Sequence, residues 1–554
     1  MTQQLNFQDF IAQQAKALGL NLGVTSDMSG EQLNTEYVFI VNDDLLVLVP
    51  VFSQSEQVCN VINMITDNFN VYPKWKRKWR DSPMLRAQCL AILSVVKDKP
   101  KAHELFLYSN GVFTKKYFSN IAKDEPKVFA MPGYRLGNLS ANEIENLFGQ
   151  HAVENLNYSF SPDQSSYFCY NNRLNLLGVG RGKDMSTMRR GAIYEYIERA
   201  SAHYDKDDSI QTSHALGQYP TVNPAQLWGV EPDREAQFFP SYDDDKPYSW
   251  VSGRNALTDE AVYIPSAMVN YLKVMPEQFL HNPNSSGCAI GNSADESAFY
   301  SALEIIERDA LMVTWYTKSA PSRIDLSNCR EKSVLEHLKW IDIKGYDVEC
   351  YDITTDIGIP SVLCLMLGRS EHNIAALVTS SAHTNPLEAL DSALAEGASL
   401  IGICELNFFR KAIDYETFKA GTDFQATENQ YMTYCYPQEL HKFDFMRNTG
   451  NTVDVDTFCE QYAADVSSMD TAYAYLKAQL VDNGYDLYVA ESTPSYIQNQ
   501  GLYFTRAFIP GAINLIFGDH PIHVNSQRVD KAASKLAWIN DASHLQFEDL
   551  QPLG

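Results

Sequence analysis

Short apolar segments separated by polar turns fill much of the first 150 residues, which is the pattern of β-strands joined as hairpins. Residues 58–65 instead carry Val and Ile at helical spacing. Two hairpins are predicted, one from Tyr37–Val41 and Leu45–Phe52, the other from Leu105–Tyr108 and Val112–Phe118. Strands and helix together predict a small α+β domain.

A polar stretch that contains Pro and Gly, residues 126–142, marks the expected boundary of this domain. We therefore predict an accessory domain over residues 1–150 and a larger domain over residues 151–554, long enough to bury a sizeable core. Within the first domain, Lys74–Arg80 interleaves five cations with two tryptophans. This segment is either a docking patch for an acidic peptide or partner, or a solvated helix face.

The larger domain contains one internal repeat, in which a Gly-containing loop precedes a helix with two glutamates. In the first copy, Gly180-Arg181-Gly182 precedes Glu195-Tyr196-Ile197-Glu198-Arg199. In the second copy, Ser285–Asn292 precedes Glu304-Ile305-Ile306-Glu307-Arg308-Asp309. Positions i and i+3 lie on one face of a helix, so each copy presents a pair of carboxylates.

Paired carboxylates repel each other unless a cation compensates them, and two kinds of cation are candidates. These are the adjacent arginines and a divalent metal such as Mg²⁺, which takes carboxylate oxygens together with substrate phosphates. A solvated amphipathic face is the simpler interpretation, but the flanking positions in both helices are apolar or small. We therefore predict a Mg²⁺-nucleotide site between the two copies. The loop glycines fit it, because they let backbone amides approach an anion.

Several classes of protein are excluded. Neither loop is a Walker motif, and residues 178–182 do not continue into the dinucleotide fingerprint of a Rossmann dehydrogenase. Acidic side chains exceed basic ones by 69 to 44, and the net charge of −25 disfavours nucleic acid as a partner. The 10 cysteines include no Cys-x-x-Cys pair, so structural zinc is not expected. With no secretory signal and no long apolar run, we expect a soluble cytoplasmic protein without a membrane partner.

Taken together, the motifs resemble the signature of the YcaO family. The second copy, read from Ser285 to Ala310, carries the match, and the first copy extends it upstream. Further downstream the resemblance includes Tyr351–Pro360, Ala382–Glu396 and Arg506–Gly511. It covers the chain from residue 155 to residue 554.

The resemblance implies an α+β fold, with a YcaO-type ATP-binding catalytic domain behind the small N-terminal α+β domain. Such enzymes phosphorylate a backbone amide oxygen after a nucleophile has added to the carbonyl, so that Cys, Ser or Thr of a ribosomally made precursor peptide becomes a thiazoline or oxazoline. By the resemblance, Mg²⁺ on ATP would be held by Glu195, Glu198, Glu304 and Glu307. It places Arg199 and Arg308 beside these carboxylates or the phosphates. It assigns the rest of the nucleotide pocket to Arg181, Ser285, Asn292, Glu296, Glu396 and Arg506.

The resemblance also implies partners. Azoline-forming members act on a precursor peptide with a ThiF-like protein or domain that binds its leader, and an azoline dehydrogenase is a further expected partner. Residues 1–150 are too short for a ThiF-like domain, so we expect them to dock a leader or a partner. The assembly would be a homodimer or a hetero-oligomeric complex. Two alternatives stay open, namely backbone thioamide formation and a non-catalytic docking scaffold.

Four positions depart from the family pattern and motivate the scaffold alternative: Arg181, Gly191, Tyr300 and Ser399 stand where Lys, Ser, Gln or His, and Gln are common. Pro552 and Gly554 end the chain in a way reminiscent of the Pro-rich tail of azoline formers.

Three other features have plain structural interpretations. His383 is either a base or a hydrogen-bonded structural residue, and Cys288 is expected to pack. Asp519, His520 and His523 lack the further ligand that a zinc site needs.

Overall fold

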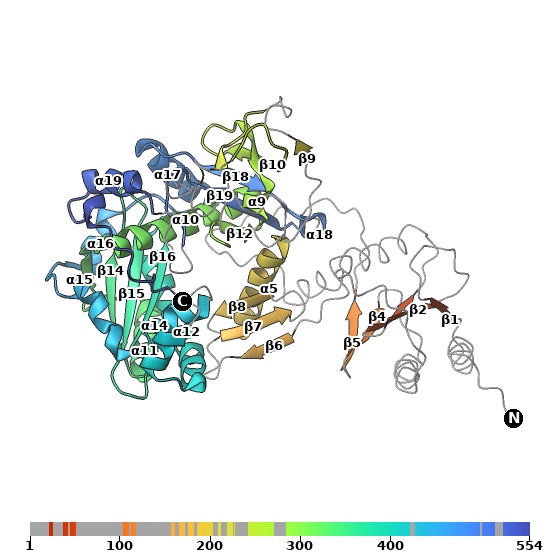
Figure 1. Ribbon diagram of the computed structural model, residues 1–554, viewed down its shortest axis with the longest axis horizontal. Coiled ribbons are helices and arrows are strands. Elements are labelled where there is room, and N and C mark those ends of the chain that lie inside the picture. The colour runs from red at the N-terminus through yellow and green to blue at the C-terminus, as the bar shows by residue number, and fades with distance from the viewer. Residues whose placement is uncertain are drawn as a thin grey trace. The chain divides into compact units, whose positions relative to one another are not determined.

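The structure is a computed structural model that describes part of the chain (Figure 1). The described residues are 22–25, 37–42, 45–50, 104–109, 112–117, 157–160, 166–171, 176–181, 185–202, 209–211, 219–224, 227, 242–270, 284–421, 427–498, 501–515 and 524–553. They fall into two units, and each is described by itself. Outside the described residues lie 58–65, Lys74–Arg80, 126–142, Gly182, Asp519, His520, His523 and Gly554. The boundary predicted at residue 150 stays a prediction.

The first unit contains a five-stranded sheet in the order β1-β2-β3-β4-β5. Its strands are Leu22–Thr25 (β1), Tyr37–Asn42 (β2), Leu45–Pro50 (β3), Glu104–Ser109 (β4) and Val112–Tyr117 (β5). β1 runs parallel to β2, and the other neighbours are antiparallel. Both predicted hairpins are present, because β2 pairs with β3 and β4 with β5.

The second unit contains three sheets. The three-stranded sheet has the order β6-β7-β8, with strands Asn157–Phe160, Ser166–Asn171 and Leu176–Arg181. The six-stranded sheet has the order β11-β10-β18-β19-β12, with β9 on β10. These strands are Ser209–Gln211 (β9), Tyr248–Asn255 (β10), Ala261–Pro265 (β11), Cys288–Gly291 (β12), Tyr488–Glu491 (β18) and Tyr503–Phe508 (β19).

The five-stranded sheet of this unit has the order β16-β15-β14-β13-β17. Its strands are Ser322–Asp325 (β13), Tyr346–Asp352 (β14), Ser361–Gly368 (β15), Ala376–Ala382 (β16) and Thr452–Asp454 (β17). Successive residues of a strand point to opposite faces. Cys364 accordingly packs in one core with helix α12 (Pro386–Lys411), and Leu363 and Leu365 pack in another with helix α10 (Ala294–Tyr316).

Helix α10 lies between the six-stranded and five-stranded sheets, in contact with β12 and β19 on one side and with β15 and β16 on the other (Figure 1). The helix starts at Ser293, whose side chain accepts a hydrogen bond from the backbone N–H of Glu296. Asp295 and Glu296 lie in the first turn, where their negative charges interact favourably with the positive end of the helix dipole. Helix α10 is therefore a rod between two layers of sheet.

Helix α5 (Met185–Ser201) packs on β8 and β7 and also contacts β12. Helix α11 (Lys332–Ile343) packs beside α12 and on β14. The remaining helical segments are α9 (Ser266–Val269), α13 (Tyr415–Gly421), α14 (Thr427–Thr433), η3 (Pro437–Phe443), α15 (Asp444–Arg447), α16 (Val455–Gln461), α17 (Met469–Asp482), α18 (Ser495–Gln498), α19 (Ser526–Lys535) and η4 (Ala542–His544). Among the helices just described, none is long and apolar enough to cross a bilayer.

Candidate functional site

Two glycines of β8 bring helix α5 against the strand. A Cβ added to Gly178 would lie 2.0 Å from the carbonyl oxygen of Ala192, and one added to Gly180 would lie 1.6 Å from that of Met188. No side chain fits in either place. These two glycines therefore have a packing role, and the expectation that the loop glycines let backbone amides approach an anion stays a prediction.

The first carboxylate of the repeat, Glu195, is held by its own neighbourhood. Its Oε2 accepts a hydrogen bond of 2.9 Å from the backbone N–H of Val179 in β8. Its Oε1 lies 2.7 Å from Nη2 of Arg199, one turn further along α5. Of the two cations considered for the repeat, the adjacent arginine is therefore the one that Glu195 contacts.

The second copy of the repeat shows the same arrangement on α10. Nη1 of Arg308 lies 3.1 Å from Oε1 of Glu307, and its Nη2 lies 3.5 Å from Oε1 of Glu304. Ser380 of β16 donates a hydrogen bond of 2.7 Å to Glu307. Burial, together with the carboxylates of Glu396 and Glu304, raises the pKa of Glu307 to about 7 against the opposite effect of Arg308.

Glu396 on α12 joins the carboxylates of α10 to β8. It acts electrostatically on Glu307 and Arg308, and its Oε1 lies 3.3 Å from Nη2 of Arg181 at the end of β8. Side chains from a strand and two helices far apart in the sequence therefore share one region. We call Glu195, Glu198, Glu304, Glu307 and Glu396 the acidic cluster.

Cys288 on β12 shows that the two copies of the repeat face each other. Its thiol is fully buried, and burial raises its pKa to about 12. The same thiol is within electrostatic reach of Glu198 and Arg199 from α5 and of Glu304 from α10. The predicted packing role of Cys288 fits this, because a buried protonated thiol is unreactive.

The carboxylates stand in pairs, each with an arginine. Within the described ranges, no three His, Cys, Asp or Glu side chains lie close enough together to hold a metal ion by themselves. Mg²⁺ commonly takes only one or two carboxylates and completes its shell with water and substrate phosphate oxygens. The all-oxygen acidic cluster fits that ion, since Glu307 is buried among like charges that a dication would compensate.

Four of the residues predicted to line the rest of the nucleotide pocket lie near β12, on β19 or near the start of α10. Asn292 donates to the Glu296 carboxylate from its side chain at 3.0 Å and from its backbone N–H at 3.2 Å. Ser285 lies in the turn before β12, where its carbonyl oxygen accepts from the N–H of Cys288. Arg506 of β19 is fully buried and lies opposite Cys288 of β12. It donates a hydrogen bond of 2.8 Å to the carbonyl oxygen of Asn284. Their roles in binding stay predictions.

A cavity of about 330 Å³ lies elsewhere in the fold, between β13, β14 and α11. Arg323, Leu338 and Cys350 are among its lining residues. It shares no residue with the acidic cluster. The cavity is therefore no part of the candidate site.

Comparison with known proteins decides the family. The YcaO cyclodehydratase family, described as ATP- and Mg²⁺-binding, matches residues 179–513. The chain belongs to the YcaO family. The recognition made from the motifs is confirmed, and ATP and Mg²⁺ are the ligands that the family description names.

Two curated relatives of this YcaO protein share about a quarter of the aligned residues with it. An uncharacterized protein of Methanothermobacter thermautotrophicus is 27% identical over 224 residues, which are 40% of this chain and 56% of the relative. The chain spans about half the length of the curated relatives that it matches.

Solved structures confirm the α+β fold. A heterocyclase in complex with substrate and cofactor has a TM-score of 0.73 at 15% identity, over 98% of this chain and 84% of the other. The heterocyclase TruD has a TM-score of 0.61 at 14% identity, over 98% of this chain and 82% of the other.

The positions at which this chain departs from the usual YcaO pattern have local explanations. Gly191 on α5 faces Gly180, and a Cβ there would lie 3.2 Å from the Cα of Gly180. Ser399 donates to the carbonyl oxygen of Glu396 within α12. Tyr300 packs its ring edge-on against Phe299 at an interplanar angle of 71°, and Arg181 pairs with Glu396. None of these contacts removes a carboxylate from the acidic cluster.

His383 has a structural role in this YcaO fold. Burial lowers its pKa to about 4, and its Nδ1 accepts a hydrogen bond of 3.0 Å from the backbone N–H of Asn385. Asn385 is in turn the N-cap of α12. Of the two interpretations of His383, the structural one fits this geometry.

Sequence reasoning missed one direct partner of the site and gave no role to another residue. Ser380, which contacts Glu307, was not singled out, and Asp309 was noted only as part of the repeat. The C-terminal tail was singled out only at Pro552 and Gly554. Leu553 of the tail forms a parallel bridge with Val378, two residues before Ser380 in β16. A serine in an apolar strand is no signal by itself, but the Asp that follows Glu-x-x-Glu-Arg was visible inside the repeat.

Proposed function

We propose that this protein is a Mg²⁺- and ATP-dependent cyclodehydratase that converts Cys, Ser or Thr of a precursor peptide to thiazoline or oxazoline. The observation that carries the proposal is the acidic cluster, in which carboxylates of α5, α10 and α12 lie in one region and are paired with Arg199, Arg308 and Arg181. Family membership supports the same chemistry. An intact cluster also argues against a non-catalytic scaffold.

The reaction needs the amide oxygen to become a leaving group. The side-chain nucleophile loses its proton and adds to the preceding carbonyl carbon, which closes the ring. The γ-phosphoryl group passes from ATP to the resulting oxygen and leaves ADP. Phosphate then departs with that oxygen while the amide nitrogen loses its proton, so that a C=N bond forms. Bound Mg²⁺ would neutralise charge on the transferring phosphoryl group. In this proposal Glu195, Glu198, Glu304 and Glu307 hold the ion, while Arg199 and Arg308 keep those carboxylates oriented.

The other predicted residues would complete the nucleotide site. Arg181 and Glu396 form an ion pair that a phosphate can enter, because one guanidinium can serve a carboxylate and a phosphate oxygen together. Ser285, Asn292, Glu296 and Arg506 lie near β12 and the N-terminus of α10. A helix N-terminus favours a bound phosphate.

The proposal includes partners and a compartment. A precursor peptide is the substrate, and a leader-binding ThiF-like protein and an azoline dehydrogenase would act with this chain in the cytoplasm. Residues 1–150 would dock the leader or the partner. Charge reversal across Lys74–Arg80, followed by a pull-down with the precursor or partner, tests that docking role, and unchanged binding would contradict it.

The first experiment is calorimetry of Mg²⁺-ATP binding to the full chain and to Glu304→Gln. We expect binding by the wild type and a large loss in the variant, because the amide cannot serve as an anionic ligand of Mg²⁺. Glu416→Gln on α13, an exposed glutamate outside the acidic cluster, is the matched control and should bind like the wild type. Equal binding by Glu304→Gln and the wild type would contradict the assignment of the site.

Mass spectrometry of a Cys- and Ser-containing precursor peptide then tests the reaction. Ring formation removes the mass of one water for each modified residue. A gain in mass that matches exchange of oxygen for sulfur would replace the proposal with thioamide formation. ATP turnover that does not depend on the peptide would contradict both.

A further inference from the structure

Helix α10 carries a buried carboxylate on the side away from the acidic cluster. Asp309 follows the Glu-x-x-Glu-Arg motif directly, and at 100° per residue it points about 200° away from Glu307 around the helix axis. Its side chain has no exposed surface. A fully buried carboxylate needs a partner.

That partner is Arg528 of α19, which contributes two nitrogens of its guanidinium, Nε and Nη2. Nε of Arg528 donates to Oδ1 of Asp309 at 2.9 Å, and Nη2 donates to Oδ2 at 2.5 Å. The backbone N–H of Ile513 donates to the same Oδ1 at 2.8 Å. Only 1% of the Arg528 side chain is exposed. The contact is a bidentate ion pair, which fixes the angle between its two planes as well as their distance.

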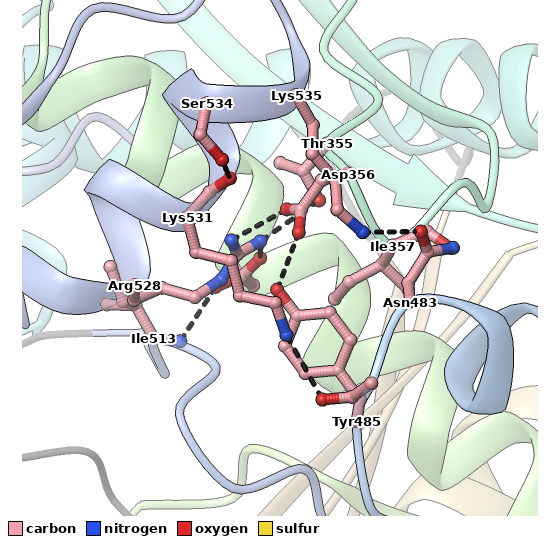
Figure 2. Close-up of polar contacts among 12 residues, drawn as sticks. Thr355, Asp356, Ile357, Asn483, Tyr485, Ile513, Arg528, Lys531, Ser534 and Lys535 are labelled. Atoms are coloured by element: carbon pink, nitrogen blue, oxygen red, sulfur yellow. Dashed lines mark hydrogen bonds and ion pairs between the residues drawn. The ribbon is translucent and has the colours of Figure 1, made fainter.

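The remaining donors of Arg528 attach the pair to a second element. Nη1 donates to Oδ1 of Asp356 at 2.7 Å, and Nη2 also lies 3.2 Å from Oγ1 of Thr355 (Figure 2). Both residues belong to the loop between β14 and β15. The hydroxyl of Tyr485 donates to the other oxygen of Asp356 at 2.8 Å. Arg528 therefore joins α10 to a loop anchored on the five-stranded sheet.

On its other side, α10 is held by the hydrogen bond from Ser380 to Glu307. The two contacts lie on opposite sides of the same turn of helix, so together they fix the rotation of α10 about its axis. A buried ion pair adds little net stability compared with apolar packing. An apolar contact between α10 and α19 could supply the same stability. It could not supply the directional geometry of the ion pair.

We propose that Arg528 is a positioning residue, which sets the rotation of α10 through Asp309 and thereby places Glu304 and Glu307 for Mg²⁺-ATP. The inference rests on the proposed function, since it concerns the same site. Arg528 itself contacts no carboxylate of the acidic cluster among its described contacts. Its action on the nucleotide site is through the helix.

The test is the Mg²⁺ concentration that gives half-maximal ATP binding, measured by calorimetry on the full chain. Arg528→Lys keeps the charge and loses the two-armed contact. We expect the Mg²⁺ midpoint to rise about 10- to 100-fold, as when a residue that orients a metal ligand is changed. Thermal unfolding of the same samples reports stability separately. A structural role alone would lower the melting temperature and leave the midpoint unchanged, which would overturn the proposal.

Tyr485→Phe is the matched control. It removes one hydrogen bond to Asp356 and leaves the Asp309 contact in place, so the Mg²⁺ midpoint should stay at the wild-type value. Should Arg528→Lys not fold, the combination of Arg528→Met, Asp309→Leu and Asp356→Leu replaces the buried charges with apolar volume, which is often neutral for stability. We expect this variant to fold and still show the raised midpoint.

The outcomes distinguish a failure of the proposed function from a failure of the positioning role. A wild type that binds no Mg²⁺-ATP would overturn the proposed function and the positioning role with it. Suppose that the wild type binds Mg²⁺-ATP and Glu304→Gln does not. An unchanged Mg²⁺ midpoint in Arg528→Lys or in the apolar variant would then overturn only the positioning role.

Discussion

His383 lies between β16 and α12, where it acts as an acceptor for the loop backbone. Its ring also meets Phe299 at right angles, with 5.9 Å between the ring centroids. Burial lowers its pKa from 6.5 to about 4. Between these two pH values the unfolded chain binds a proton at this position that the folded chain does not.

Stability should therefore fall as the pH decreases from about 6.5 to about 4, and His383 should account for about 3 kcal/mol of that loss. We expect His383→Asn to abolish this part of the pH dependence, because an Asn oxygen can accept from the N–H two residues later without titrating. Urea unfolding midpoints at pH 7 and pH 5 measure the difference. His372→Asn, an exposed position in a turn, is the control and should keep the wild-type pH dependence.

At the scale of elements, the packing of α5 on β8 depends on the absence of two side chains. Gly180 has no room for a Cβ, whereas Gly191 opposite it has a contact at 3.2 Å that a small shift relieves. The same interface aligns Glu195 with the backbone of Val179, and Arg181 at the end of β8 pairs with Glu396 of α12. The interface therefore supports both stability and the acidic cluster.

Gly180→Ala should lower the free energy of unfolding by about 1–3 kcal/mol, because the methyl group meets the carbonyl oxygen of Met188. In Gly191→Ala a gain in helix propensity of about 1 kcal/mol offsets the tight contact, so we expect almost no change. Denaturant unfolding of both variants measures the contrast. A larger loss in Gly191→Ala than in Gly180→Ala would contradict this account of the interface.

Local patterns in the sequence predicted the features that depend only on residues close together in the chain. The two hairpins of the first unit and the paired carboxylates of α5 and α10 followed from periodicity and spacing. The packing role of the β8 glycines could not be predicted, because a Gly-containing sequence does not show which backbone approaches it. Partners of the site on other elements could not be predicted either, since Asp309 meets a residue 219 positions away and Glu307 one 73 positions away.

For the whole of the second unit, the segment that follows α19 holds the C-terminal half of α10. Asn540 donates to the carbonyl oxygens of Thr317 and Lys318 just after the helix ends. Asp549 lies 2.9 Å from Nζ of Lys318 and 2.8 Å from Nζ of Lys442. Although burial opposes it, hydrogen bonds from the two lysines keep the pKa of Asp549 below its usual value.

Asp549→Asn should lower the free energy of unfolding at pH 7 by about 1–3 kcal/mol, because it leaves two largely buried lysines without that anion. The depressed pKa means that this stabilisation is present above the ordinary pKa of an Asp and disappears as the pH falls through its folded value. Urea unfolding measures it. Glu548→Gln, the same chemical change at the exposed neighbouring position, should have little effect.

Helix α10 spans about 35 Å and belongs to two cores at once. Residues such as Ala302 and Ile306 pack with Leu476 and Val489, whereas Leu311 and Trp315 pack with Val529 and Leu553. Because both cores share this helix, unfolding of one core disrupts the other, so neither can open while its neighbour stays intact. In hydrogen exchange under native conditions, the amides of α10 should therefore be protected along its whole length and should exchange in a single cooperative opening.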